Sequence, residues 1–474
     1  MGHARRLERT GRNPRPAIAL KHQGESPIMS TTETNGRAAP PMETPYSKAS
    51  YRYFVLGVLT LVYALNFVDR QLLVILQEQI KEELLLSDTQ LGLLSGFAFA
   101  LFYVSCGIPI ARWADRGVRR NIIALALTVW SGMTAVSGLA QNYLHLLLAR
   151  VGVGVGEAGG SPPAHSMISD IFPEKERATA LSIYSIGIYI GILTGFALGG
   201  FIAETFGWRM AFLVVGLPGI LVALLLRLTV AEPIRGWSEK RENEVGQSPS
   251  IFDVLRFLWS RKTFRNLALA GSLQATVIYA VGNWLPSFFL RNHEIGLAQL
   301  GVWMALTSGF GGGAGSFFGG WFADKMGQRD RRWYVWGSAI MILAITPVLL
   351  IMLNTGNLLL ALLLTGVFHF LSASYLGPAL AVSHGLVGLR MRALTSAVFF
   401  FFINLIGLGL GPLIVGYLSD TFTAGGDENP LSAAMLIVGC IASAWGCVHY
   451  VLASRHIRED IANSPASAPE IEAL

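Results

Sequence analysis

The sequence predicts an all-α membrane protein with twelve transmembrane helices in two pseudo-symmetric six-helix bundles. Three observations lead to this prediction. The chain has 474 residues, of which 52% are apolar and only 14% are charged, whereas a soluble protein carries about 25% charged residues. Long apolar segments recur along the whole chain, and motifs of the first half return in the same order in the second.

A membrane-spanning helix needs about 20 mostly apolar residues, and twelve segments of the chain meet this requirement. The spans of the first half begin near Tyr53, Leu91, Asn121, Tyr143, Ala178 and Met210. The spans of the second half begin near Phe264, Leu297, Trp333, Leu358, Leu394 and Leu431. We therefore expect one six-helix bundle over residues 51–230 and another over residues 263–455.

The remaining segments are polar. Residues 1–50 lack the apolar core of a cleavable signal peptide, and we expect them, like residues 456–474, to be disordered. Residues 231–262 form a polar linker between the bundles. Its end, "SIFDVLRFLWSRK", places Ile251, Val254, Leu255 and Leu258 on one helical face. This pattern fits a helix on the membrane surface and equally a linker helix packed on the bundle.

Cationic side chains gather in the loops on one side of the expected membrane, as in "ARWADRGVRR" and "ADKMGQRDRR". A loop on the opposite side, "SDTFTAGGDENP", holds no lysine or arginine. The positive-inside rule then places both termini and the linker in the cytoplasm. The excess of 36 Lys and Arg over 30 Asp and Glu is thus a topology signal, and we expect no nucleic-acid partner.

The two halves repeat each other. "GIPIARWADRGVRR" after the second span matches "GGWFADKMGQRDRR" after the eighth, and "ERATALS" at the fifth matches "MRALTSA" at the eleventh. A six-helix unit duplicated in parallel is typical of transporters built from two rocking bundles.

The D-R-x-x-R-R and D-K-x-G-x-R loops resemble the signature of the major facilitator superfamily. More narrowly, "ALNFVDRQ" in the first span and "RVGVGVGEAGGSPPA" in the fourth resemble the Spinster family. This resemblance implies a major facilitator fold in a bacterial inner membrane and transport by alternating access. It also implies proton linkage, and the animal members of the family imply lysolipids or sphingosine phosphate-like lipids as substrates.

Charged residues inside the first and fourth spans are candidates for the transport chemistry. Arg150 and Glu157 lie two helical turns apart on one face, at depths of about 10 and 20 Å from the periplasmic side. Asp69 lies about 10 Å from that side on the first span, so it is a natural partner for Arg150. Arg70 points about 100° away from Asp69, and packing is as plausible for it as substrate contact.

An ionised side chain in the bilayer needs a partner, water or neutralisation. Arg150 keeps its proton and so needs a carboxylate or a substrate anion, whereas Glu157 can accept a proton. We expect Asp69, Glu157 and Arg150 to couple transport to protons, and Arg150 and Arg70 to bind the substrate head group. The alternatives are a static Asp69–Arg150 pair that fixes helix packing and a permanently protonated Glu157.

The remaining site predictions concern the cavity and the cytoplasmic gate. The aromatic and amide groups expected to line a substrate cavity are Asn66, Tyr279, Asn283, Trp284, His369, Phe400 and Asn404.

Charges at the cytoplasmic ends of the second and eighth spans are expected to contact helix ends across the bundles. The resemblance implies that these charges latch the outward-facing state. They are Asp115, Arg116, Arg119, Asp324 and Lys325. For the cations of this set, Arg116, Arg119 and Lys325, anchoring to anionic lipid is the alternative role.

The favoured function is proton-coupled transport of an anionic amphiphile by a monomer in the bilayer. A proton symporter of small organic anions and a non-transporting lipid-binding scaffold remain as alternatives. The chain shows no nucleophile elbow, phosphate loop or CxxC pair, so we expect no enzyme, metal or cofactor. The glycines after Arg150 lack the preceding strand that a nucleotide fingerprint requires, and small residues at this density allow close helix packing in lipid.

Overall fold

The structure is a computed structural model that describes residues 44–237, 251–388 and 391–464. The chain divides into two units, residues 1–44 and 45–474, and the helices below belong to the second. The segments predicted to be disordered at the chain ends fall largely outside the described residues, as does part of the linker.

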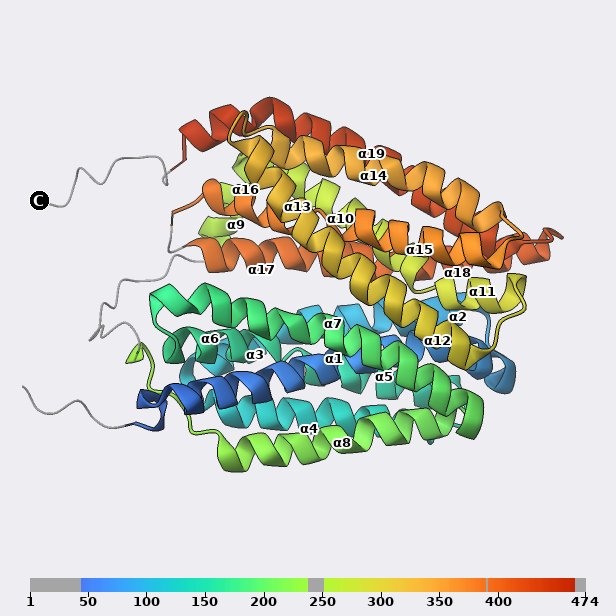
Figure 1. The fold of residues 1–474 in the computed structure, drawn as a ribbon, viewed down its shortest axis with the longest axis horizontal. Coiled ribbons are helices and arrows are strands. Elements are labelled where there is room, and N and C mark those ends of the chain that lie inside the picture. Colours follow the sequence, from blue (N-terminus) through green and yellow to red (C-terminus); the bar gives the residue numbers. More distant parts are fainter. Residues whose placement is uncertain (1–43, 238–250, 389–390, 465–474) are drawn as a thin grey trace, which may run out of the picture. The chain divides into compact units, whose positions relative to one another are not determined.

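Within the second unit, the helices of the first half follow the predicted spans (Figure 1). A short 3-10 turn, η1 (Pro45–Ser47), precedes them, and the second span contains a π-helical turn, η2 (Leu93–Phe97). The helices are α1 (Ala49–Leu84), α2 (Asp88–Gly92), α3 (Ala98–Arg116), α4 (Arg119–Ser137), α5 (Tyr143–Glu157), α6 (Ser161–Ile171), α7 (Glu174–Phe206) and α8 (Trp208–Thr229).

The second half repeats this plan and has π-helical turns in its eighth and eleventh spans. These turns are η4 (Thr307–Gly311) and η6 (Ile403–Leu410). The helices are α9 (Ile251–Ser260), α10 (Lys262–Gly282), α11 (Leu285–Asn292), α12 (Leu297–Leu306), α13 (Gly312–Gly327), α14 (Trp333–Asn354), α15 (Leu358–Ala373), α16 (Leu376–Gly385), α17 (Arg392–Phe402), α18 (Gly411–Ala424) and α19 (Pro430–Ala462).

These helices correspond in chain order to the twelve predicted spans. Eight described stretches are long and apolar enough to cross a membrane on their own. The other four spans are α4 and three pairs of shorter helices, namely α5 with α6, α10 with α11, and α12 with α13. The two-bundle helical fold predicted from the sequence is therefore confirmed.

Glycines on α7 bring it against α1. A side chain on Gly191 would place its Cβ 2.4 Å from the carbonyl oxygen of Ala64, and one on Gly187 would lie 2.7 Å from that of Thr60. Small residues at such positions let helix backbones approach closely in lipid. Helix α1, which carries Asp69, is thereby held firmly inside the first bundle.

The two halves also approach each other closely, at the end where α7 finishes and α12 begins. A Cβ on Gly301 would lie 2.5 Å from the carbonyl oxygen of Phe196, and one on Gly416 would lie 2.2 Å from that of Asp88. The charge distribution in the loops predicts that this end faces the periplasm. The halves therefore meet there through backbone contacts that larger side chains would prevent.

The C-terminal helix extends beyond the predicted boundary at residue 455, which corrects the expectation that disorder begins at residue 456. Helix α19 continues to Ala462 because polar contacts fix its last turns. Arg458 donates to Asp330 over 2.6 Å, and Asp460 accepts from the backbone N–H of Thr263 over 2.8 Å. The backbone N–H of Arg332, with the Arg332 and Arg458 guanidiniums, holds the pKa of Asp330 below its usual range.

The linker helix α9 packs on the second bundle. Val254 and Leu258 are buried, while Phe252 is exposed, so the helix shows the one-sided apolar pattern that the sequence predicts. Trp259 stacks on Phe402 with ring centroids 5.6 Å apart. The packed linker helix is thus the arrangement that this structure contains.

Glycine packing between α13 and α15 gives a stability prediction. A Cβ on Gly319 would lie 1.9 Å from the carbonyl oxygen of Ser374, whereas one on Gly320 would meet nothing within 4 Å. We expect Gly319→Ala to destabilise the protein by about 1–3 kcal/mol, the typical cost of overpacking. Gly320→Ala is the matched control, and thermal unfolding in detergent measures both. Equal melting temperatures for the two variants would contradict the prediction.

Candidate functional site

Asp69 and Arg150 form an ion pair between α1 and α5. Nη1 of Arg150 lies 3.4 Å from Oδ1 of Asp69, and both residues are only 2% exposed. The other carboxylate oxygen of Asp69 accepts a hydrogen bond from the hydroxyl of Thr134 on α4. The structure therefore brings Asp69 and Arg150 together as their matching depth predicts, and a third helix completes the contact.

Arg70 and Glu157 form a second ion pair between the same two helices. Nε and Nη2 of Arg70 each lie 2.7 Å from the same oxygen, Oε2 of Glu157. Glu157 is 1% exposed, and its other oxygen, Oε1, has no hydrogen-bond partner among the described residues. One carboxylate oxygen thus remains available to a proton or to a further donor.

Aromatic rings surround the guanidinium of Arg70. Its Cζ lies 5.2 Å from the ring centroid of Phe67, 4.8 Å from that of Phe99 and 5.1 Å from that of Tyr103. The faces of aromatic rings attract cations, most strongly where water is excluded. The charge of Arg70 is consequently stabilised by three rings in addition to Glu157.

The glycine-rich sequence of α5 explains how its charges reach the interior. A Cβ on Gly154 would lie 2.8 Å from the carbonyl oxygen of Phe99 on α3, and one on Gly156 would lie 2.7 Å from the backbone nitrogen of Trp130 on α4. This close packing directs Arg150 and Glu157 towards α1. Helix α5 ends at Glu157, and α6 begins at Ser161 with proline in its first turn, where proline is well tolerated. The fourth span is therefore broken between Glu157 and Ser161, just before the prolines.

Sequence reasoning missed the pair formed by Arg70 and Glu157. The angle of about 100° between consecutive helical residues separates Asp69 from Arg70, and it made Arg70 look peripheral. That angle allows two neighbours on α1 to reach two residues of α5 at different heights. The sequence signal that could have predicted this pair is the charge balance between the two helices. Asp69 and Arg70 on α1 carry the charges that complement Arg150 and Glu157 on α5.

Three of the predicted cavity residues lie in the first half or at its contact with the second half. Asn66 is buried on α1, and Tyr279 on α10 is an electrostatic neighbour of Arg70. The carbonyl oxygen of Asn283 accepts a hydrogen bond from Gln77 over 2.6 Å, which links the two halves.

Three other cavity candidates are engaged within the second half. The indole of Trp284 donates to the carbonyl oxygen of Pro412, and Nε2 of His369 lies 3.0 Å from the hydroxyl of Ser308. The amide of Asn404 donates to the carbonyl oxygen of Phe400 one turn earlier. Trp284, His369 and Asn404 each therefore make at least one hydrogen bond within the second half.

Of the predicted cytoplasmic gate residues, two are exposed at the end of α3 and two make contacts within the second half. Asp115 and Arg116 are exposed at the end of α3. Asp324 accepts from the hydroxyl of Tyr334 over 2.9 Å, and Nζ of Lys325 lies 4.9 Å from the ring centroid of Trp321. Both contacts are local to the second half.

Arg119 differs from the expectation that it contacts the opposite bundle. It is buried at the start of α4 and bonds Asp170 of its own half and Glu232 at the start of the linker, as well as the hydroxyl of Ser166 over 2.8 Å. A buried guanidinium needs acceptors for its N–H groups, and these neighbours, with the carbonyl oxygen of Pro233, supply four of them. Arg119 therefore ties the linker to the end of the first bundle where α4 begins.

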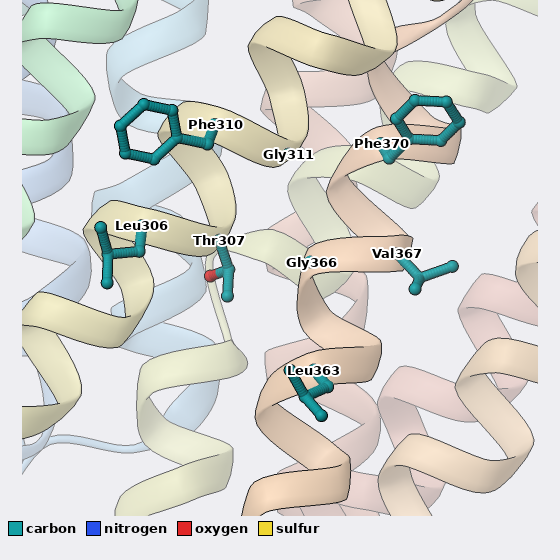
Figure 2. Close-up of a pocket in the computed structure, with 8 residues that line it drawn as sticks. All are labelled: Leu306, Thr307, Phe310, Gly311, Leu363, Gly366, Val367 and Phe370. Atoms are coloured by element: carbon teal, nitrogen blue, oxygen red, sulfur yellow. The ribbon is translucent and has the colours of Figure 1, made fainter.

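A hollow of about 510 Å³ lies between the α12–η4 segment and α15. Figure 2 shows Phe310 and Leu306 on one side, Phe370 and Leu363 on the other. The hydroxyl of Thr307 already donates to the carbonyl oxygen of Trp303 over 2.8 Å. Because its lining residues carry no charge, this hollow does not provide the site for an anionic head group.

Two similar six-helix halves, buried ion pairs inside the bundle and close contacts between the halves at one end define a membrane transporter of the two-bundle class. Residues 59–412 match the Major Facilitator Superfamily. The chain belongs to this superfamily and is a transporter of the Spinster type, not an enzyme.

The most informative relatives agree with this assignment. An MFS-type efflux pump of Mycolicibacterium smegmatis is 33% identical over 85% of this chain and 93% of its own length. A probable L-galactonate transporter of Escherichia coli is 26% identical over 82% of this chain and 86% of its own. The crystal structure of a bacterial homologue of the human lysosomal transporter Spinster, inward-facing and unoccupied, is 32% identical, covering 87% of this chain and 99% of that one, with a TM-score of 0.78.

The Asp69–Arg150 pair gives a second stability prediction. Asp69→Asn leaves the charge of Arg150 buried without its carboxylate, and breaking a buried pair in this way costs about 3–5 kcal/mol. We expect a clear loss of thermal stability in detergent. The double variant Asp69→Asn/Arg150→Gln removes both charges and should recover part of the loss. A single variant that melts like the parent protein would refute the importance of the pair.

Proposed function

We propose that the protein is a proton-coupled secondary transporter of an anionic amphiphile, of the lysophospholipid or sphingosine phosphate kind. It would operate by alternating access in a bacterial inner membrane, with both termini in the cytoplasm. The observation that carries this proposal is the coupled arrangement of two buried ion pairs between α1 and α5.

The charge balance of the two pairs provides the coupling. Two carboxylates and two guanidiniums sum to zero, which is the least costly state for a site inside the bilayer. A proton on Glu157 removes one negative charge, and Arg70 then has a free positive charge. An anionic head group that binds Arg70 returns the site to neutrality, so the proton and the anion are expected to bind together.

The surroundings of Arg70 suit such an exchange. Phe67, Phe99 and Tyr103 contact its guanidinium and stabilise the cation while its carboxylate partner is neutral. Tyr279 comes from the opposite half, so a head group at Arg70 would be positioned where the two halves meet. The aromatic and apolar side chains nearby favour an amphiphile over a fully polar substrate.

Transport of a small organic anion is a second candidate. The relationship to a probable L-galactonate transporter supports it, and paired arginines bind a carboxylate as well as a phosphate. The chemistry of proton coupling is the same in both candidates, so they differ only in the apolar part of the substrate.

Reconstituted protein tests both candidates. We expect uptake of a labelled lysophospholipid to follow an imposed pH gradient, and Glu157→Gln to reduce gradient-driven flux by about tenfold or more, within the 5–150-fold range of typical coupling energies. Asp69→Asn is measured beside it. Glu83→Gln is the matched control, because Glu83 pairs with Arg209 outside the site.

Three other results would change the conclusion. Gradient-driven flux of galactonate without flux of lysophospholipid would favour the small-anion candidate. Lysophospholipid flux that ignores the gradient and both carboxylate variants would make the charges structural. Binding of lysophospholipid without flux would leave a lipid-binding scaffold.

A further inference from the structure

A second group of charges lies near the C-terminal end of α1, where the two halves meet. Arg291 at the end of α11 bonds two carboxylates of the first half. Its Nε and Nη2 lie 2.9 and 2.7 Å from the oxygens of Glu78, and its Nη1 and Nη2 lie 2.8 Å from those of Asp88. One guanidinium of the second half thus makes two bidentate contacts with the first, the strongest geometry for such pairs.

Asp88 is the centre of this group. It is 2% exposed and also accepts from Nζ of Lys81 over 2.5 Å and from the hydroxyl of Ser419 over 2.6 Å. Its position at the start of α2 adds the favourable end of the helix dipole. Donors from both halves therefore converge on one buried carboxylate.

Asp420 on α18 makes the reciprocal contact. Its carboxylate accepts from the backbone N–H groups of Asp88 and Thr89, over 3.0 and 2.8 Å, and from the hydroxyl of Thr89 over 2.5 Å. The absence of a side chain at Gly416 permits this approach, since a Cβ there would lie 2.2 Å from the carbonyl oxygen of Asp88. Helix α18 thus caps the N-terminus of α2 across the interface.

Most of these contacts exist only while the periplasmic ends of the halves are together. On separation Asp88 keeps Lys81 and α2 keeps its own N-cap Ser87, but Arg291 loses both carboxylates and the backbone N–H groups of Asp88 and Thr89 lose Asp420. We propose that Glu78, Asp88, Arg291, Ser419 and Asp420 form a periplasmic latch that stabilises the state closed on the periplasmic side. The latch rests on alternating access and is independent of the proposed substrate and of proton coupling.

Distance measurements between spin labels test the latch. The labels are placed at Leu85→Cys and Glu428→Cys, two exposed sites on opposite halves at this end, after Cys106, Cys440 and Cys447 are replaced by serine. The parent protein should give mainly a short distance. Arg291→Gln and Asp88→Asn should each raise the population at longer distance about tenfold or more, since the loss of even one charged hydrogen bond has an effect of this size.

Arg209→Gln is the matched control, because Arg209 bonds Glu83 and the carbonyl oxygen of Ala140 at the same end but within one half. The double variant Arg291→Gln/Asp88→Asn should change the distance population by less than the product of the two single effects, since both substitutions remove the contact between Arg291 and Asp88.

Unchanged distances in folded Arg291→Gln and Asp88→Asn would overturn the latch, and so would an equal change in Arg209→Gln. If Arg291→Gln does not fold, Glu78→Gln decides in its place by removing one of the two carboxylates. Because the distances are measured without substrate or a pH gradient, failure of the latch and failure of the proposed transport function are distinguishable.

Discussion

The structure depends on the need to pair every charge that enters the bilayer. An unpaired ion at the centre of a membrane helix costs about 2.5–3.5 kcal/mol even on the most lenient scale. Here Asp69 pairs with Arg150 and Arg70 pairs with Glu157, so all four charges are compensated between α1 and α5. The glycines of α5 and α7 follow from this requirement, because only small residues bring the helices close enough for the pairs to form.

The same pairing rule separates two sets of buried charges by how completely their hydrogen-bonding atoms are paired. Glu157 has an oxygen without a partner among the described residues, and aromatic rings stabilise Arg70 when its carboxylate is neutralised. Arg119, by contrast, bonds two carboxylates, a hydroxyl and a backbone carbonyl from the first half and the start of the linker. These four bonds hold Arg119 in place, whereas the Arg70–Glu157 pair keeps an unpaired carboxylate oxygen and is the pair that we propose exchanges partners during transport.

The sequence predicted the elements of the fold well because hydropathy and loop charge are local properties. The twelve spans, the duplicated halves and the depth match of Asp69 and Arg150 all came from spacing along single helices. The Arg70–Glu157 pair and the contacts of Arg119 were missed because they depend on how helices rotate against one another. The end of α19 was misplaced for a related reason, since Arg458 is held by Asp330, 128 residues away.

Helix α1 connects the buried ion pairs to the interface between the halves. It is unbroken from Ala49 to Leu84, and Glu78 lies about 12 Å along its axis from Arg70 at 1.5 Å per residue. The fourth span, by contrast, is divided into α5 and α6. Because α1 is unbroken, the backbone that positions Asp69 and Arg70 against α5 also positions Glu78 against Arg291 of the second half. The pairing of charges inside the first bundle and the contact between the halves therefore depend on the same helix.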